Sequence, residues 1–181
     1  MKKVFLILTL TISTASLFAQ KKTTTSAIIA FDATTAIDAL AKAENKTAIA
    51  AIDTKSGSVA FEATVKNFAF SNPTIQEHFN GEKWLHSDAH PSFTFKGNIV
   101  DLSSVNFAKD GSYKANVDGT LTVKGKEQKV TVPATIEVKG SSLSASANFS
   151  IVLADYGISG APIDGGKVAK EPKITVNVDF K

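Results

Sequence analysis

An alternation of apolar and polar residues, sustained over most of the chain, constrains the fold more than any other feature of this sequence. In six long stretches between residues 58 and 180, every second residue is apolar and the residues between them are mostly polar. Side chains of a β-strand point alternately to the two sides of a sheet, so this period of two predicts strands with one buried and one solvated face. The six stretches are residues 58–65, 92–99, 113–124, 130–138, 143–153 and 174–180.

The N-terminal part of the chain is expected to add two strands, at residues 27–32 and 48–53. Lys55-Ser56-Gly57 is a turn signal that separates the second of these from the stretch that follows, and a hairpin is expected around Gly125-Lys126. The total is then about eight antiparallel strands. Such strands must either close on themselves or pack as two sheets to cover their apolar face.

A change of the buried face favours a closed barrel over two packed sheets. After Lys66, the even-numbered Phe68 and Phe70 replace the odd-numbered apolar residues of the same stretch, and a bulge at this point would curl the sheet. No repeat or low-complexity linker divides the chain. We therefore predict an all-β fold, an eight-stranded antiparallel barrel, in one domain that covers residues 20–181.

One or two short helices are expected beside the strands. Residues 35–44 predict the first, because Thr35 and Asp38 resemble a capping box and the apolar residues that follow share a face. The second is expected after Asn72-Pro73, since proline suits the first position of a helix. Both are too short to form a core of their own.

Residues 1–19 have the order of a secretory signal peptide. Lys2 and Lys3 precede an uncharged run over residues 4–12, and small residues lead to Ala19. The run is much shorter than the roughly 20 residues that a helix needs to span a bilayer. We expect cleavage after Ala19 and export to the periplasm or the exterior; the alternative is a buried first strand or helix.

Composition excludes several classes of function. The chain has no cysteine, so disulfides, thiolate metal sites and a cysteine nucleophile are all excluded. All 20 basic residues are lysine, and loss of residues 1–19 would leave 18 of them against 17 acidic residues. Nucleic-acid binding usually shows clustered lysine and arginine, so we expect no nucleic-acid partner.

The expected interior contains little bulk and almost no charge. An eight-stranded barrel is either just filled by its side chains or holds one small ligand. The inward positions that lack bulk are Ala63, Gly97, Ala115, Gly119, Ala134, Ala145 and Ala147. Two interpretations stay open on this pattern, an apolar lipid cavity and a core plugged by Phe61, Phe93, Phe95, Phe149 and Phe180.

The polar residues give little support for catalysis or metal binding. His86 and His90 have the spacing of two metal ligands on one helical face, but Pro91 argues against a helix there. Asp88 beside them suggests an acid–base pair, although one hydrophilic loop explains all three residues more simply. The chain has no HExxH or GxSxG motif, so neither a metal nor a catalytic residue is expected.

Three segments, in this order, resemble the YceI-like family. The first runs from Glu77-His78-Phe79-Asn80 through Trp84 to His90-Pro91 and Phe93-Thr94-Phe95-Lys96-Gly97. The second joins Gly119-Thr120-Leu121-Thr122-Val123-Lys124-Gly125 to Lys129-Val130-Thr131-Val132-Pro133. The third is Ala147-Asn148-Phe149-Ser150-Ile151 with Asp155-Tyr156-Gly157-Ile158. The resemblance implies a lipocalin-like barrel that is exported to the periplasm and holds a polyisoprenoid chain or an isoprenoid quinone.

On this basis we expect a non-catalytic protein that binds, carries or sequesters a long apolar lipid and needs no cofactor. Its expected partner is a polyisoprenoid or quinone-type lipid; no membrane-spanning segment is expected, and a homodimer stays an alternative. The expected cavity lining is Phe61, Ala63, Phe93, Phe95, Tyr113, Ala115, Ala145, Ala147 and Phe149, with Phe79 and Trp84 over one end. Tyr113 would also offer a hydroxyl to a head group.

Two functions of other classes remain as alternatives. One is a hydrolase or isomerase that acts on a small apolar substrate at residues 78–90. The other is a stress or interaction protein whose barrel is a ligand-free scaffold.

Overall fold

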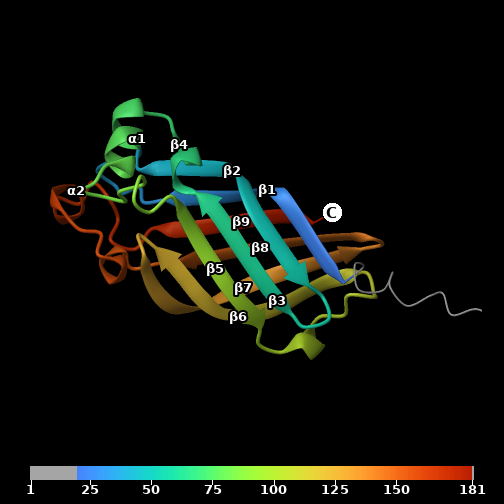
Figure 1. The fold of residues 1–181 in the computed structure, drawn as a ribbon. Coiled ribbons are helices and arrows are strands. Elements are labelled where there is room, and N and C mark those ends of the chain that lie inside the picture. The colour runs from blue at the N-terminus through green and yellow to red at the C-terminus, as the bar shows by residue number, and fades with distance from the viewer. Residues whose placement is uncertain (1–19, 181) are drawn as a thin grey trace, which may run out of the picture.

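The computed structural model describes residues 20–180, which form a barrel of β-strands with short helices at one end (Figure 1). The signal peptide expected at residues 1–19 lies outside the described residues. The strands are β1 (Lys21–Asp32), β2 (Lys42–Asp53), β3 (Ser58–Thr64), β4 (Ala69–Phe70), β5 (Ser92–Ile99), β6 (Gly111–Val123), β7 (Lys126–Lys139), β8 (Ser142–Ser150) and β9 (Lys173–Phe180). The helices are α1 (Pro73–Asn80) and α2 (Ala161–Asp164), with 3-10 turns η1 (Val65–Asn67), η2 (Leu102–Ser104) and η3 (Leu153–Tyr156).

The strands close into the predicted barrel. Neighbours follow the order β1-β9-β8-β7-β6-β5-β3-β2, and β2 returns to pair with β1. Every pairing among the described strands is antiparallel, and the short β4 adds a ninth strand beside β2. The expectation of an eight-stranded antiparallel barrel is confirmed. Closure buries the apolar faces of the strands in the barrel interior.

The β6–β7 hairpin sets the register of the longest strand pair. Val123 pairs with Lys126 across a two-residue turn in which Lys124 and Gly125 have φ of 51° and 71°. Positive φ at both central residues is the type I′ turn, whose twist matches that of the strands it joins. The predicted hairpin is confirmed, and its register continues without interruption to the pair of Gly111 with Val138.

The helix predicted at residues 35–44 is wrong. Residues 33–41 form the loop between β1 and β2, in which the Oγ1 of Thr35 accepts hydrogen bonds from the backbone N–H groups of Ile37 and Asp38. Ile37 is 71% exposed and Leu40 is 44% exposed, so the residues expected on one helical face do not pack together against the core. Pairing of Phe31 with Ala43 extends the strands instead, since alternate small residues of β2 fit the barrel interior as well as they fit a helix.

The segment after β3 differs in detail from the expected bulge. The chain leaves the strand through η1 and returns briefly as β4, so Phe68 is buried by a tight turn and not by a bulge in a continuing strand. The helix expected after Asn72 is confirmed as α1. Its N-terminus is capped by the Oδ1 of Asn72, which accepts from the N–H of Thr74 at 2.9 Å.

The two ends of the barrel differ in cover. α1, α2 and the loop between β1 and β2 lie together at one end, while short turns and η2 form the other (Figure 1). Residues 157–170 contain α2 and bury Ile158 and Ile163 at the covered end. The N–H of Ala169 donates to the carbonyl of Ala33 at 2.9 Å, which ties this segment to the β1–β2 loop.

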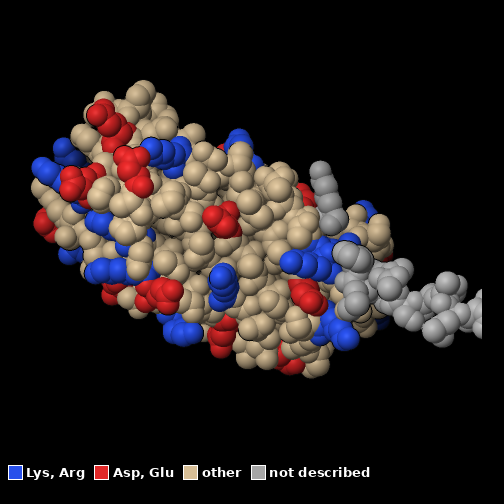
Figure 2. All heavy atoms as spheres, in the orientation of Figure 1, with Lys and Arg blue, Asp and Glu red and all other residues tan. Residues whose placement is uncertain are grey.

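Charged residues of both signs are interspersed over the outer surface seen in Figure 2, with no extended patch of lysine on that face. Across residues 20–180, no helix combines the length and the apolar character needed to cross a membrane.

Candidate ligand cavity

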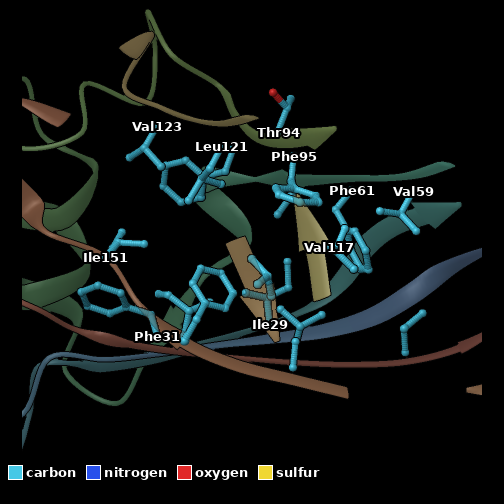
Figure 3. Close-up of a pocket in the computed structure, with 18 of the residues that line it drawn as sticks. Ile29, Phe31, Val59, Phe61, Thr94, Phe95, Val117, Leu121, Val123 and Ile151 are labelled. Carbon is cyan, nitrogen blue, oxygen red and sulfur yellow. The ribbon is translucent and has the colours of Figure 1, made fainter. Parts of the chain in front are cut away.

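The barrel interior holds a cavity of about 160 Å³ that touches side chains from strands on all sides of the barrel. Figure 3 shows Phe61 and Phe95 reaching inward from β3 and β5, while Ile29 and Phe31 face them from β1. At the covered end, Phe79, Trp84 and other residues outside the strands complete the wall. The cavity therefore extends along the barrel and ends beneath α1 and the loop that follows it.

The structure places nine of the eleven residues expected at the cavity on its wall. They are Phe61, Ala63, Phe79, Trp84, Phe93, Phe95, Ala145, Ala147 and Phe149. Tyr113 and Ala115 do not line it. The hydroxyl of Tyr113 donates to the carbonyl of Lys109 at 2.8 Å, so it is engaged within the loop that precedes β6 and is not directed at the interior.

The sequence-based set omitted a large part of the wall, including residues of β2, β6, β7 and β9 and two further segments. Ile29 and Phe31 come from β1, whose alternation is interrupted by register shifts on either side of Ala27. Leu153 and Ile158 come from η3 and the residues after it, beyond the last strand residue of β8. Ile158 could have been identified from the sequence, because it belongs to the Asp155-Tyr156-Gly157-Ile158 segment that resembles the YceI-like family.

The wall is apolar throughout. Of the described residues that line the cavity, none is charged or titratable, and only Thr94 and Ser146 have a polar side chain. Both occupy outward positions of their strands, and Figure 3 shows the hydroxyl of Thr94 pointing away from the aromatic rings. A bound molecule would therefore be held by burial of its apolar surface, with no ion pair to fix it.

The inward glycines do not leave empty space. A Cβ at Gly119 would lie 2.5 Å from Cζ of Phe95, and a Cβ at Gly97 would lie 2.9 Å from the same atom. The ring of Phe95 therefore lies directly on the backbone of β5 and β6. This ring therefore occupies the space that the two glycines leave at the wall.

Phenylalanine rings fill the covered end. The ring centroid of Phe79 lies 4.8 Å from that of Phe70, 5.8 Å from that of Phe31 and 6.0 Å from that of Phe68. Phe68 also meets Phe93 edge-on at 5.6 Å. Tilted and edge-to-face pairs at these distances add to the stabilisation from burial. The five phenylalanines expected as a plug all line the cavity, and of them only Phe93 takes part in these ring contacts. A different set of rings therefore fills the covered end, and space remains along the barrel wall.

The groups with shifted pKa values lie away from the cavity. Hydrogen bonds from the side chain and backbone of Thr34 lower the pKa of Asp32, and those from Ser103 lower the pKa of Asp101. Burial raises the pKa of Tyr156 to about 12, with a smaller contribution from the charge of Asp155. These shifts report turns and packing and do not mark a reactive group in the interior.

The histidines do not assemble a reactive site with Asp88. The rings of His86 and His90 lie 6.0 Å apart, and His78 is exposed on α1. Asp88 accepts a hydrogen bond from the Nζ of Lys66 at 2.6 Å, and this contact lowers its pKa. Over residues 20–180, no group of three His, Asp or Glu residues is placed to hold a metal ion, and none of the three histidines lines the cavity.

Comparison with known proteins agrees with this fold. The YceI-like domain matches residues 11–180. BcnA of Burkholderia cenocepacia superposes with a TM-score of 0.72 at 21% identity, over 86% of this chain and 96% of that one. A polyisoprenoid binding domain from Saccharophagus degradans gives a TM-score of 0.74 at 13% identity, over 90% and 98%.

The YCEI protein of Campylobacter jejuni gives a TM-score of 0.53 at 18% identity, over all of this chain and 94% of that one. No curated protein matches the chain. The structural neighbours establish the fold, and the domain match covers nearly the whole sequence. The chain belongs to the YceI-like family.

Proposed function

We propose that this protein binds the apolar chain of an isoprenoid lipid inside its barrel and carries or sequesters it without catalysis. The observation that carries the proposal is the cavity itself, which lies inside a closed barrel and has an apolar wall with no titratable group among the described residues. The neighbour from Saccharophagus degradans, described as a polyisoprenoid binding domain, supports the same class of ligand.

The size of the cavity determines how such a chain would fit. At about 160 Å³, the free volume is close to the ~150 Å³ of a cavity that binds benzene, so about one five-carbon isoprene unit fits without movement. A longer chain requires the rings of the wall, such as Phe61 and Phe95, to change rotamer. Each Å² of apolar surface buried would contribute about 25 cal/mol before the entropic costs of binding and of ordering the chain.

We also propose export, because residues 1–19 carry the charged, apolar and cleavage order of a signal peptide. A carrier in the periplasm would shield an isoprenoid chain from water between membranes. A polyisoprenoid and an isoprenoid quinone share this tail chemistry and differ in the polar end.

The direct test is native mass spectrometry of the protein purified from its own periplasm, followed by organic extraction and identification of bound lipid. We expect a mass increment that corresponds to one isoprenoid chain per protein. A mass equal to the polypeptide alone, retained after incubation with isoprenoid quinones, would contradict the proposal and favour the scaffold alternative.

Trp84 gives a second readout, because it is the only tryptophan of the chain and it lines the cavity. A quinone ring drawn close to it is expected to quench its fluorescence. Replacement of His86 and His90 by alanine separates this function from the enzyme alternative. A carrier keeps its lipid and its quenching in the double variant, whereas an enzyme at residues 78–90 loses turnover.

A further inference from the structure

Pairing between β7 and β8 covers only part of their length. It runs from Lys139 with Ser142 to Ala134 with Ala147, and no further pair joins these strands among the described residues. β7 continues to Lys126 with β6 as its only paired neighbour, and β8 continues to Ser150 along β9. The barrel wall therefore has a break between residues 126–133 of β7 and the end of β8.

Pro133 accounts for the position of the break. In an antiparallel pair, hydrogen-bonded and non-hydrogen-bonded residue pairs alternate. The two-residue turn between Lys139 and Ser142 closes on a hydrogen-bonded pair, so Thr135 with Ser146 is also such a pair and Pro133 with Asn148 would be the next. Proline has no N–H to donate to Asn148, and the ladder ends one residue earlier.

The other end of the break is held by a side chain. The Nε2 of Gln128 donates to the backbone carbonyl of Asp155, in η3, at 3.0 Å. Between this hydrogen bond and the pair of Ala134 with Ala147, no ladder joins the two sides among the described residues. The break in the ladder is thus bounded at both ends and is not a frayed end of the barrel.

Depressions lie on both sides of the wall where the pairing stops. The outer one is a groove whose rim includes the polar side chains of Lys114, Asn116 and Asn148. It shares Ala134, Ser146 and Ala147 with the inner cavity. The wall between groove and cavity is therefore one strand thick and carries small side chains there.

A lipid with a polar end needs such an arrangement. The cavity wall offers no charged or titratable side chain among residues 20–180, and burying a polar group without a hydrogen bond costs a few kcal/mol. The polar end of an isoprenoid must therefore stay outside while the tail is inside. The groove offers it amide, hydroxyl and ammonium groups directly beside the cavity.

We propose that the break between β7 and β8 is a side portal, through which the isoprenoid tail enters the cavity while the polar end of the lipid stays in the outer groove. The inference rests on the proposed function and adds to it a route and a head-group site.

The test is a disulfide across the break, in a chain that has no cysteine of its own. The variant Pro133→Cys with Asn148→Cys is oxidised, and protein that still has free thiols is removed. The disulfide form is then mixed in a stopped-flow instrument with a naphthoquinone that carries a two-unit isoprenoid tail. Quenching of Trp84 reports loading. We expect the disulfide to slow loading at least tenfold relative to the same variant after reduction; the reduced variant itself should load several-fold more slowly than the wild type, because replacing Pro133 supplies the missing N–H.

The matched control is Glu137→Cys with Ser144→Cys, which joins the same two strands at a pair that is already formed and lies outside both the cavity and the groove. Loading in this control is expected to match the wild type in both redox states. An unchanged rate in the oxidised portal variant, or equal slowing in the control, would overturn the portal. Absence of any quenching in the wild type would instead contradict the proposed function.

A second variant needs no disulfide. Pro133→Val supplies the missing N–H and is expected to lengthen the ladder by one pair, to protect that amide from hydrogen exchange and to slow loading several-fold. Thr131→Val, on the same strand and face, adds no donor and serves as its control. Loading by Pro133→Val at the wild-type rate would overturn the portal.

Discussion

At the covered end of the barrel, phenylalanine rings pack ring against ring, whereas the wall from β5 to β8 combines large side chains with alanine and glycine. Phe79 has ring contacts with three other phenylalanines and is 5% exposed. Along the wall, Ala134 and Ala147 face each other across strands and line the cavity. Both regions are apolar, yet one has its volume filled and the other keeps volume free.

The difference separates two roles that a single hydrophobic core usually combines. Contacts between large buried side chains stabilise the fold, and a cavity forfeits part of that stabilisation. Placing the large rings at one end allows the barrel to remain stable with space in its centre. A change at the covered end should therefore affect stability first, and a change at the wall should affect binding first.

The largest expected effect on stability comes from Phe79→Ala. Loss of a buried phenylalanine that contacts three others should lower the free energy of unfolding by about 3–5 kcal/mol, while lipid binding persists. Urea unfolding measures the first and native mass spectrometry the second. Phe70→Ala is the control, because Phe70 is only half-buried and should cost less. Equal losses in the free energy of unfolding for the two variants would show that the buried Phe79 is no more important for stability than the half-buried Phe70.

Ala147→Trp should have the opposite outcome. The indole would occupy the cavity, so we expect lipid affinity to fall at least a hundredfold, about 2.7 kcal/mol, with little loss of stability. Val138→Trp is the control, since Val138 is also buried, at 6% exposed, but lines neither the cavity nor the outer groove. There overpacking should cost roughly 1–3 kcal/mol and leave binding in place. A destabilised Ala147→Trp protein that still binds lipid would show that the space is not the binding site.

The sequence predicts the strands and their register well, because the patterns that encode them admit few alternatives. Alternation together with the positive-φ turn at Lys124-Gly125 defines the strands and their register, because shifting a strand by one residue exposes its whole apolar face. Residues 35–44 mislead because alanines satisfy a helical period and a strand period equally, and only pairing with β1 decides between them.

The cavity was predictable in composition but not in shape. Small inward residues mark where bulk is missing, and nine expected residues do line the space. Which small residues leave volume free depends on the rotamers of their neighbours. The ring of Phe95 covers Gly97 and Gly119, and no sequence pattern shows this. The hydroxyl of Tyr113 is likewise captured by a backbone carbonyl four residues earlier, a contact that only the loop geometry provides.

The position of the Phe95 ring gives a smaller and more specific prediction. Gly119→Ala places a methyl group 2.5 Å from Cζ of Phe95 and 2.6 Å from the carbonyl oxygen of Lys96, so the ring must move toward the cavity. We expect a loss of roughly 1–3 kcal/mol in stability and weaker lipid binding. In a double-mutant cycle with Phe95→Leu, the double variant should be at least about 0.5 kcal/mol more stable than the sum of the two single losses predicts, because leucine can move away from the new methyl group. Strictly additive losses of stability would mean that the contact of the new methyl group with the carbonyl oxygen of Lys96, and not its contact with the Phe95 ring, causes the strain.

The smallest expected effect belongs to Tyr156, which lies in η3 at the covered end and is 1% exposed. Its pKa of about 12 in the folded protein lies above the ordinary value of 10.0, because burial disfavours the phenolate. The unfolded chain therefore loses this proton first. The stability that the neutral phenol contributes is complete below pH 10 and is lost as the pH rises to 12, by at most about 2.7 kcal/mol.

Urea unfolding at increasing pH measures this loss, and Tyr156→Phe is the control, because it keeps the ring and all lysines. The wild type should lose more stability than the variant across this window. Parallel curves for the two proteins would mean that water reaches the hydroxyl and that the covered end is less tightly packed than its rings imply.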